Sequence, residues 1–252
     1  MIKLLKYDWK RNANSLLVAS AIWLIAQLLL VLLSIGNGWD YTKVYPIVVM
    51  LYGLAAFMAF LMACQTFNSN ITAYSRRLLP VSSYSSVFSP LLLLALLHAA
   101  LGLLFVAHDL FIAKRLGLDG ALFRLFVDQL GFFEQLIVIA AYFWGMLYSA
   151  LIIFFCIAFA KTFQGKAGTW IGILVCLCLF IGLSILDTLL FPVTGYSNNI
   201  FGVSVVSQES GPVLYKVVPF EAADWLRLLF EIVVGALLAA GTVRMMNKKV
   251  KL

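Results

Sequence analysis

Long apolar stretches and short polar segments alternate along this chain. A helix needs about 20 apolar residues to cross the hydrocarbon core of a bilayer. Six stretches reach that length, and none of them has the polar face that a helix on a soluble core would show. The pattern predicts an all-α integral membrane protein with six transmembrane helices. The predicted crossings are residues 15–36, 45–67, 87–108, 136–160, 168–190 and 224–245.

The segment before the first crossing, residues 1–14, has its own periodicity. Ile2, Leu5 and Trp9 recur at spacings of three and four, and lysines flank them. An apolar face beside basic residues is typical of a helix that lies in the membrane interface. We therefore predict an N-terminal amphipathic interfacial helix. The alternative is an ordinary basic flank that only orients the first crossing.

The loop between the second and third crossings, residues 68–86, is rich in serine. Its centre holds two arginines, two leucines and a proline, at Arg76, Arg77, Leu78, Leu79 and Pro80. The residue before a proline avoids the helical conformation, so Pro80 predicts the end of a short helix over residues 70–78. The leucine pair predicts contact with the lipid interface or with a partner protein, and the pattern does not choose between them.

Basic residues are divided unequally between the two sides of the predicted bundle. Twelve of the 18 Lys and Arg residues fall on the side that holds both termini, residues 68–86 and residues 161–167, where Asp8 is the only acid. Loops rich in Lys and Arg stay in the cytoplasm. Both termini are therefore predicted to be cytoplasmic. The net charge of +7 is mainly this orientation signal.

The composition agrees with a membrane protein. The chain is 63% hydrophobic and 12% charged, whereas soluble domains carry about 25% charged residues. No segment is long enough for a separate soluble domain, so we expect one transmembrane domain over residues 1–252. The first apolar run is too long for the core of a signal peptide, and we expect it to be retained. The four cysteines fall within predicted crossings and are expected to be free thiols.

Several motifs of catalytic proteins are missing. The chain has no phosphate-binding loop of the Walker type and no HExxH pair. We therefore expect no enzyme activity, no catalytic residue, no metal site and no bound cofactor in this chain. The sequon at Asn70, Ile71 and Thr72 lies on the predicted cytoplasmic side, so we expect no glycan there.

Ionisable residues inside the crossings are scarce. Asp187 and Glu231 are candidates for lining a water-filled vestibule, because charges at membrane depth usually serve transport. The interpretation we favour for Glu231 is an ion pair with Arg227, four residues earlier on the same helix. For His98, in the third crossing, packing or an interhelical hydrogen bond is favoured over catalysis.

Two further segments have distinctive patterns. Gly168 and Gly172 open the fifth crossing, and small residues at this spacing predict a close helix contact. The outer segment 191–223 is rich in glycine, serine and asparagine, and it has apolar ends. Such a segment is expected to fold against the membrane or line a cavity.

Taken together, the order of elements resembles the permease subunits of bacterial ATP-binding-cassette (ABC) exporters of the type-2 class. The resemblance covers the whole chain. It includes the basic N-terminal helix ahead of six crossings, the short turn at residues 161–168 and the large outer segment with Val218-Pro219-Phe220. The most specific element is similar to the family's "LLPvs" segment and reads Arg77-Leu78-Leu79-Pro80-Val81-Ser82.

This resemblance implies partners and roles. The permease would form a homo- or heterodimer with a second permease copy and bind two ABC ATPase subunits, which hold the ATP and Mg. Short extracellular helices would lie between the fifth and sixth crossings, in a gate segment at residues 191–223. The implied ATPase-coupling residues are Tyr74, Arg76, Arg77, Leu78, Leu79 and Pro80. The implied gate residues are Pro192, Val218, Pro219 and Phe220.

The cargo implied by such a bundle is amphipathic or hydrophobic, because the crossings are rich in Phe, Leu and Met and poor in charge. An antimicrobial or signalling peptide, a lipid or a drug fits that chemistry. One alternative is a secondary transporter, which would show inverted repeats, and none is visible. Another is a regulatory polytopic membrane protein without an ATPase partner.

Overall fold

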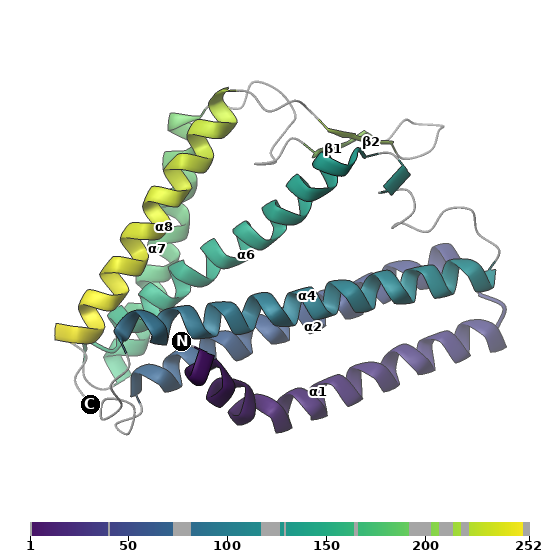
Figure 1. Cartoon of the computed structure of the whole chain (residues 1–252), viewed down its shortest axis with the longest axis horizontal. Coiled ribbons are helices and arrows are strands. Elements are labelled where there is room, and N and C mark those ends of the chain that lie inside the picture. Colours follow the sequence, from purple (N-terminus) through teal and green to yellow (C-terminus); the bar gives the residue numbers. More distant parts are fainter. Residues whose placement is uncertain are drawn as a thin grey trace. The chain divides into compact units, whose positions relative to one another are not determined.

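The computed structural model describes most of the chain, and helices dominate it (Figure 1). The described residues are 2–39, 41–72, 82–116, 127–128, 130–163, 166–191, 203–206, 214–217 and 222–248. They form two compact units, Met1–Asp119 and Gly120–Leu252. No break in composition in the sequence marks this boundary.

The first unit consists of three long helices that contact one another, α1 (Ile2–Gly36), α2 (Tyr41–Thr72) and α4 (Ser83–Leu116). Two apolar clusters hold them together. One is built on the buried side chains of Val44, Val48 and Tyr52, and the other on Ala59, Leu93 and Leu97. In the first cluster, Tyr52 meets two further aromatic rings edge-on and donates its hydroxyl proton to the Leu104 carbonyl at 3.1 Å.

The second unit contains α6 (Phe132–Ala160), α7 (Lys166–Leu190) and α8 (Ala222–Lys248). Helix α6 contacts both α7 and α8. Their shared cluster is built on Ile152 and Cys156 of α6 and Leu238 of α8. The cysteines Cys64, Cys156, Cys176 and Cys178 all lie in helices and form no disulfide, as predicted.

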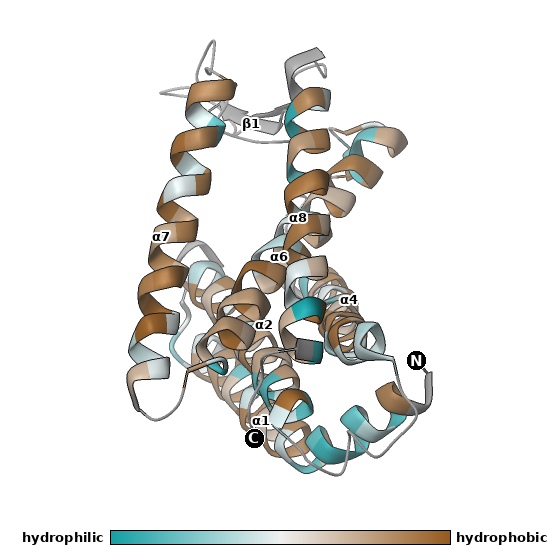
Figure 2. Ribbon diagram, turned by 90° about the vertical axis from the view of Figure 1, so that its left-hand side faces the viewer, coloured by the Kyte–Doolittle hydropathy of each residue, from teal (hydrophilic) through white to brown (hydrophobic). Residues whose placement is uncertain are grey.

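Six of the helices in the described part of the chain are long and apolar enough to cross a membrane, which confirms the six predicted crossings. Much of their surface is apolar and exposed, in keeping with a multi-pass membrane protein. Figure 2 shows this most clearly for α7, whose ribbon is hydrophobic along most of its length. The most apolar window of α7 contains no buried residue.

The N-terminal segment is helical but does not form a separate helix. Residues 2–14 are the first part of α1, which runs without interruption to Gly36 and bends near its start (Figure 1). The other predicted loop, residues 68–86, is partly helical. Its first residues complete α2 up to Thr72, and Ser83 begins α4.

The short helices expected between the fifth and sixth crossings are a wrong prediction for the residues described there. Those residues form two strands, β1 (Val203–Val206) and β2 (Leu214–Val217). The strands pair antiparallel, with Val203 opposite Val217 and Val206 opposite Leu214. Valines and a tyrosine favour extended structure, and this local preference explains the strands.

Candidate functional site

A buried carboxylate joins the three helices of the first unit. Asp8 of α1 is 0% exposed. Its Oδ2 atom accepts hydrogen bonds from the Ser89 hydroxyl of α4 at 2.6 Å and from the Asn70 side-chain amide of α2 at 3.3 Å. One residue of the N-terminal helix therefore binds both the end of α2 and the start of α4.

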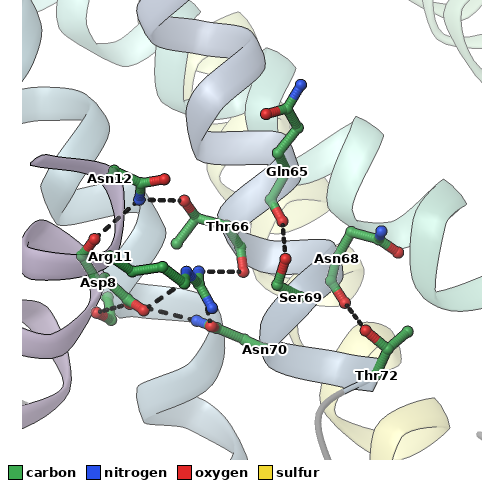
Figure 3. A network of polar contacts seen from close by, with 10 residues as sticks. Asp8, Arg11, Asn12, Gln65, Thr66, Asn68, Ser69, Asn70 and Thr72 are labelled. Carbon is green, nitrogen blue, oxygen red and sulfur yellow. Dashed lines mark hydrogen bonds and ion pairs between the residues drawn. The ribbon is translucent and has the colours of Figure 1, made fainter. Parts of the chain in front are cut away.

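Two neighbours of Asp8 extend this network (Figure 3). The Arg11 guanidinium lies 3.5 Å from Asp8 Oδ1 and donates to the Thr66 carbonyl and to Asn70 Oδ1, at 3.2 and 3.3 Å. The Asn12 side-chain amide donates to the Thr66 hydroxyl and to the Asp8 carbonyl, each at 2.8 Å. We call this set the polar clasp; its members are Asp8, Arg11, Asn12, Thr66, Asn70 and Ser89.

The helical repeat explains why the clasp forms. Residues three and four apart share a face of a helix, so Asp8, Arg11 and Asn12 project from α1 together. Thr66 and Asn70 do the same on α2. A buried carboxylate is costly unless it is paired and hydrogen-bonded, and here a hydroxyl, an amide and a guanidinium together satisfy Asp8.

The clasp holds the two helices that flank residues 73–81, which contain the predicted ATPase-coupling residues. Helix α2 ends at Thr72, two residues after Asn70, and α4 begins at Ser83, six residues before Ser89. The clasp therefore fixes the two helices between which residues 73–81 run. The predicted coupling residues themselves, Tyr74, Arg76, Arg77, Leu78, Leu79 and Pro80, lie outside the described residues.

Sequence reasoning missed the clasp. In the sequence, Asp8 stands out only as the single acid on a basic side, and the available signal for the clasp is that this lone acid lies four residues before Asn12. Asn70 stands out only as part of a sequon. Its side chain is buried in the clasp, which gives it a structural role.

The apolar residues predicted to face the membrane interface, Ile2, Leu5 and Trp9, do not share one environment. Leu5 is half-buried and packs against the Ala59, Leu93 and Leu97 cluster, whereas Trp9 is exposed. The face of α1 that turns inward runs through Leu4 and Asp8. The side chain of Ile2 is outside the described residues. Contact of this segment with lipid stays a prediction.

The second unit holds the ionisable residues singled out in the crossings. Arg227 of α8 forms its ion pair with Asp187 of α7. The Trp144 indole of α6 donates to Glu231 Oε2 at 2.8 Å. The predicted ion pair between Glu231 and Arg227 is therefore wrong. The Arg227 guanidinium binds Asp187 on the neighbouring helix instead, and Glu231 accepts a hydrogen bond from the Trp144 indole. Glu231 is 7% exposed and therefore buried.

The other predicted positions are resolved as follows. His98 is buried, which confirms the predicted packing, and its Nδ1 lies 3.0 Å from the Leu94 carbonyl of its own helix. The close contact predicted at the start of the fifth crossing is also confirmed. A Cβ atom on Gly172 would lie 2.7 Å from Ala160 Cβ, and one on Gly168 would lie 2.6 Å from the Ala160 carbonyl.

The predicted gate residues Pro192, Val218, Pro219 and Phe220 lie outside the described residues. Within the part of the chain that the structure describes, no group of three or more His, Cys, Asp or Glu side chains could hold a metal ion.

Comparison with protein-family models, with curated proteins and with solved structures found no match. The functional argument therefore depends on the residues of this chain and on the contacts described above.

Proposed function

We propose that this chain is the membrane-spanning permease subunit of a bacterial ABC exporter. A second permease copy would complete the export path, and two separate ATPase subunits would bind and hydrolyse ATP. The subunit itself would be non-catalytic. Its cargo would be amphipathic or hydrophobic, such as a peptide, a lipid or a drug.

The observation that carries this proposal is the clasp, which joins the helices that precede and follow residues 73–81. A segment that transmits force from an ATPase must be joined rigidly to the transmembrane helices. Asp8 joins the N-terminal helix to the end of α2 and the start of α4 by hydrogen bonds from Asn70 at 3.3 Å and from Ser89 at 2.6 Å. Between those helix ends the chain carries two arginines, an adjacent leucine pair and a proline, which suit docking in a groove of a partner protein.

The proposed orientation places both termini and residues 73–81 in the cytoplasm. The twelve-to-six division of Lys and Arg supports this. The exposed side chains of Lys6, Tyr7, Trp9 and Lys10 would then meet the cytoplasmic lipid headgroups. The segment between α7 and α8 would lie outside and act as the gate.

Purification of the tagged chain from its native host in mild detergent tests the proposal. We expect a stoichiometric partner that carries a Walker motif and hydrolyses ATP. Replacing Leu78 and Leu79 by Asp should remove the partner while leaving the helices folded. The control replaces Phe163, an exposed apolar residue in the other predicted cytoplasmic turn, by Asp.

Recovery of the intact chain without any ATPase, in several detergents, would overturn the proposal. It would favour a secondary transporter or a regulatory membrane protein. Under a secondary transporter, Asp187 and Glu231 would be the first residues to test, since ionisable groups at membrane depth carry coupling ions or protons.

A further inference from the structure

One guanidinium lies within reach of two carboxylates in the second unit. We call Asp187, Arg227 and Glu231 the ionic triad. Arg227 pairs with Asp187 across the helices, and Glu231 accepts its hydrogen bond from Trp144. Yet Glu231 lies four residues after Arg227 on α8, the spacing at which Glu and Arg side chains meet on a helix. The guanidinium therefore has two acceptors to choose from.

The observed pair leaves bonding capacity unused. Arg227 Nε and Asp187 Oδ1 are both buried and have no hydrogen-bond partner. A fork-to-fork arrangement would have used both atoms. The contact is instead a single bond between one guanidinium nitrogen and one carboxylate oxygen. A single bond of this kind is easier to exchange than a bidentate pair.

The position of the pair gives such an exchange a consequence. Asp187 lies three residues before the end of α7 at Leu190, and Arg227 lies five residues after the start of α8 at Ala222. The two helix ends also meet through the rings of Phe191 and Phe230, whose centroids are 5.9 Å apart. The ion pair therefore joins the end of α7 to the start of α8, and the two strands lie between them in the sequence.

The remainder of α7 is held elsewhere. Its tightest packing is at the other end, where Gly168 and Gly172 contact Ala160 of α6. Its most apolar window has no buried residue. Val175, Cys176, Leu179 and Leu183 of α7 pack against the Ile152, Cys156 and Leu238 cluster, so the helix is held as far as Leu183. Beyond Leu183 its end is bound by the ion pair and by the Phe191–Phe230 ring contact. This last part of α7 is able to move when the ion pair exchanges.

We propose that Arg227 is a two-position switch. Bound to Asp187 it holds the ends of α7 and α8 together, and bound to Glu231 it releases the end of α7 beyond Leu183. The guanidinium stays paired in both states, which limits the cost of the exchange in an apolar environment. The carboxylate left alone on release is Asp187, at 23% the more exposed of the two. The consequence for the gate segment rests on the proposed function.

Distances between spin labels in lipid nanodiscs test the switch without any ATPase. The labels go on cysteines at Leu189 and Leu226, both exposed neighbours of the pair, after the four native cysteines are replaced. Asp187→Asn should raise the ratio of long to short distances on the order of tenfold, because it removes the negative charge that pairs with the partly buried Arg227. Asp187→Glu should return the short distance. Glu134→Gln is the control, since Glu134 only accepts from the Gly131 amide of its own helix turn.

Glu231→Gln keeps an acceptor for Trp144 but removes the competing charge, so it should not raise the long-distance population. An unchanged distribution in Asp187→Asn overturns the switch, and so does release in Glu231→Gln. If Asp187→Asn does not fold, Arg227→Gln takes its place, and a folded Arg227→Gln with only the short distance also overturns it. None of these results affects the permease proposal, which copurification tests separately.

Discussion

The polar clasp of the first unit and the ionic triad of the second show two ways of placing charge among apolar helices. Asp8 is 0% exposed, and donors from three helices meet its carboxylate. Asp187 and Arg227 are partly exposed, share one bond and leave buried atoms without hydrogen bonds. A fully satisfied polar network makes a structure rigid, whereas a partly satisfied one leaves alternatives open. The clasp is therefore suited to hold α1, α2 and α4 together, and the ionic triad is suited to exchange the partner of Arg227.

The largest effect is expected from breaking the clasp. Asp8→Ala removes the acceptor of Ser89 and Asn70 and the charge partner of Arg11, which leaves buried donors without partners. We expect a loss of about 3 kcal/mol of stability, the size seen when one member of a buried pair is removed. The midpoint of thermal unfolding in detergent measures it. Asp128→Ala, at an exposed side chain, is the control. Equal midpoints for the two variants would show that the clasp does not hold the helices.

The next largest effect is expected at the start of α7, the end of the helix that is remote from the triad and packs against α6. Gly172→Ala places a methyl group 2.7 Å from Ala160 Cβ, and such overpacking costs about 2 kcal/mol. Gly182→Ala is the matched control on the same helix, because nothing lies within 4 Å of its Cβ position. It should be neutral or gain up to about 1 kcal/mol from helix propensity. Comparing the midpoints of thermal unfolding of the two variants tests this prediction. A lowered midpoint in both variants would contradict the account.

The smallest effect has the opposite sign. Gln27 is buried on α1, and neither side-chain amide atom has a hydrogen-bond partner. Gln27→Leu should therefore raise stability by about 1 kcal/mol, since an apolar side chain has no buried donor or acceptor to leave unpaired. Gln135→Leu is the matched control and should lower stability, because Gln135 donates to the Leu130 carbonyl at 2.8 Å. A lower unfolding midpoint in Gln27→Leu would mean that the amide is satisfied in the protein.

The fold was predictable where one physical term dominates. Apolar length alone places all six helices that could span a membrane, and the small-residue spacing places the contact at Gly172. The residues of Val203–Val206 and Leu214–Val217 favour extended structure locally, but which segments pair as strands depends on contacts between parts of the chain separated in the sequence.

The site was predictable only in part, for a similar reason. Spacing on one helix made Glu231 the natural partner of Arg227, but the choice among acceptors depends on where α7 brings Asp187. The clasp likewise joins residues that are 62 and 81 positions apart. No periodicity within one helix could have brought those residues together.

The most direct test of the central claim is photo-crosslinking from residue 78 in native membranes. A photoreactive phenylalanine analogue replaces Leu78, the residue implied to dock on the ATPase, and one at the exposed Leu103 of α4 serves as the control. The account predicts a protein adduct from position 78 that contains a Walker-motif ATPase, and no such adduct from position 103. An intact, membrane-inserted chain whose position 78 gives only lipid adducts, or adducts with proteins that lack an ATPase motif, would contradict it.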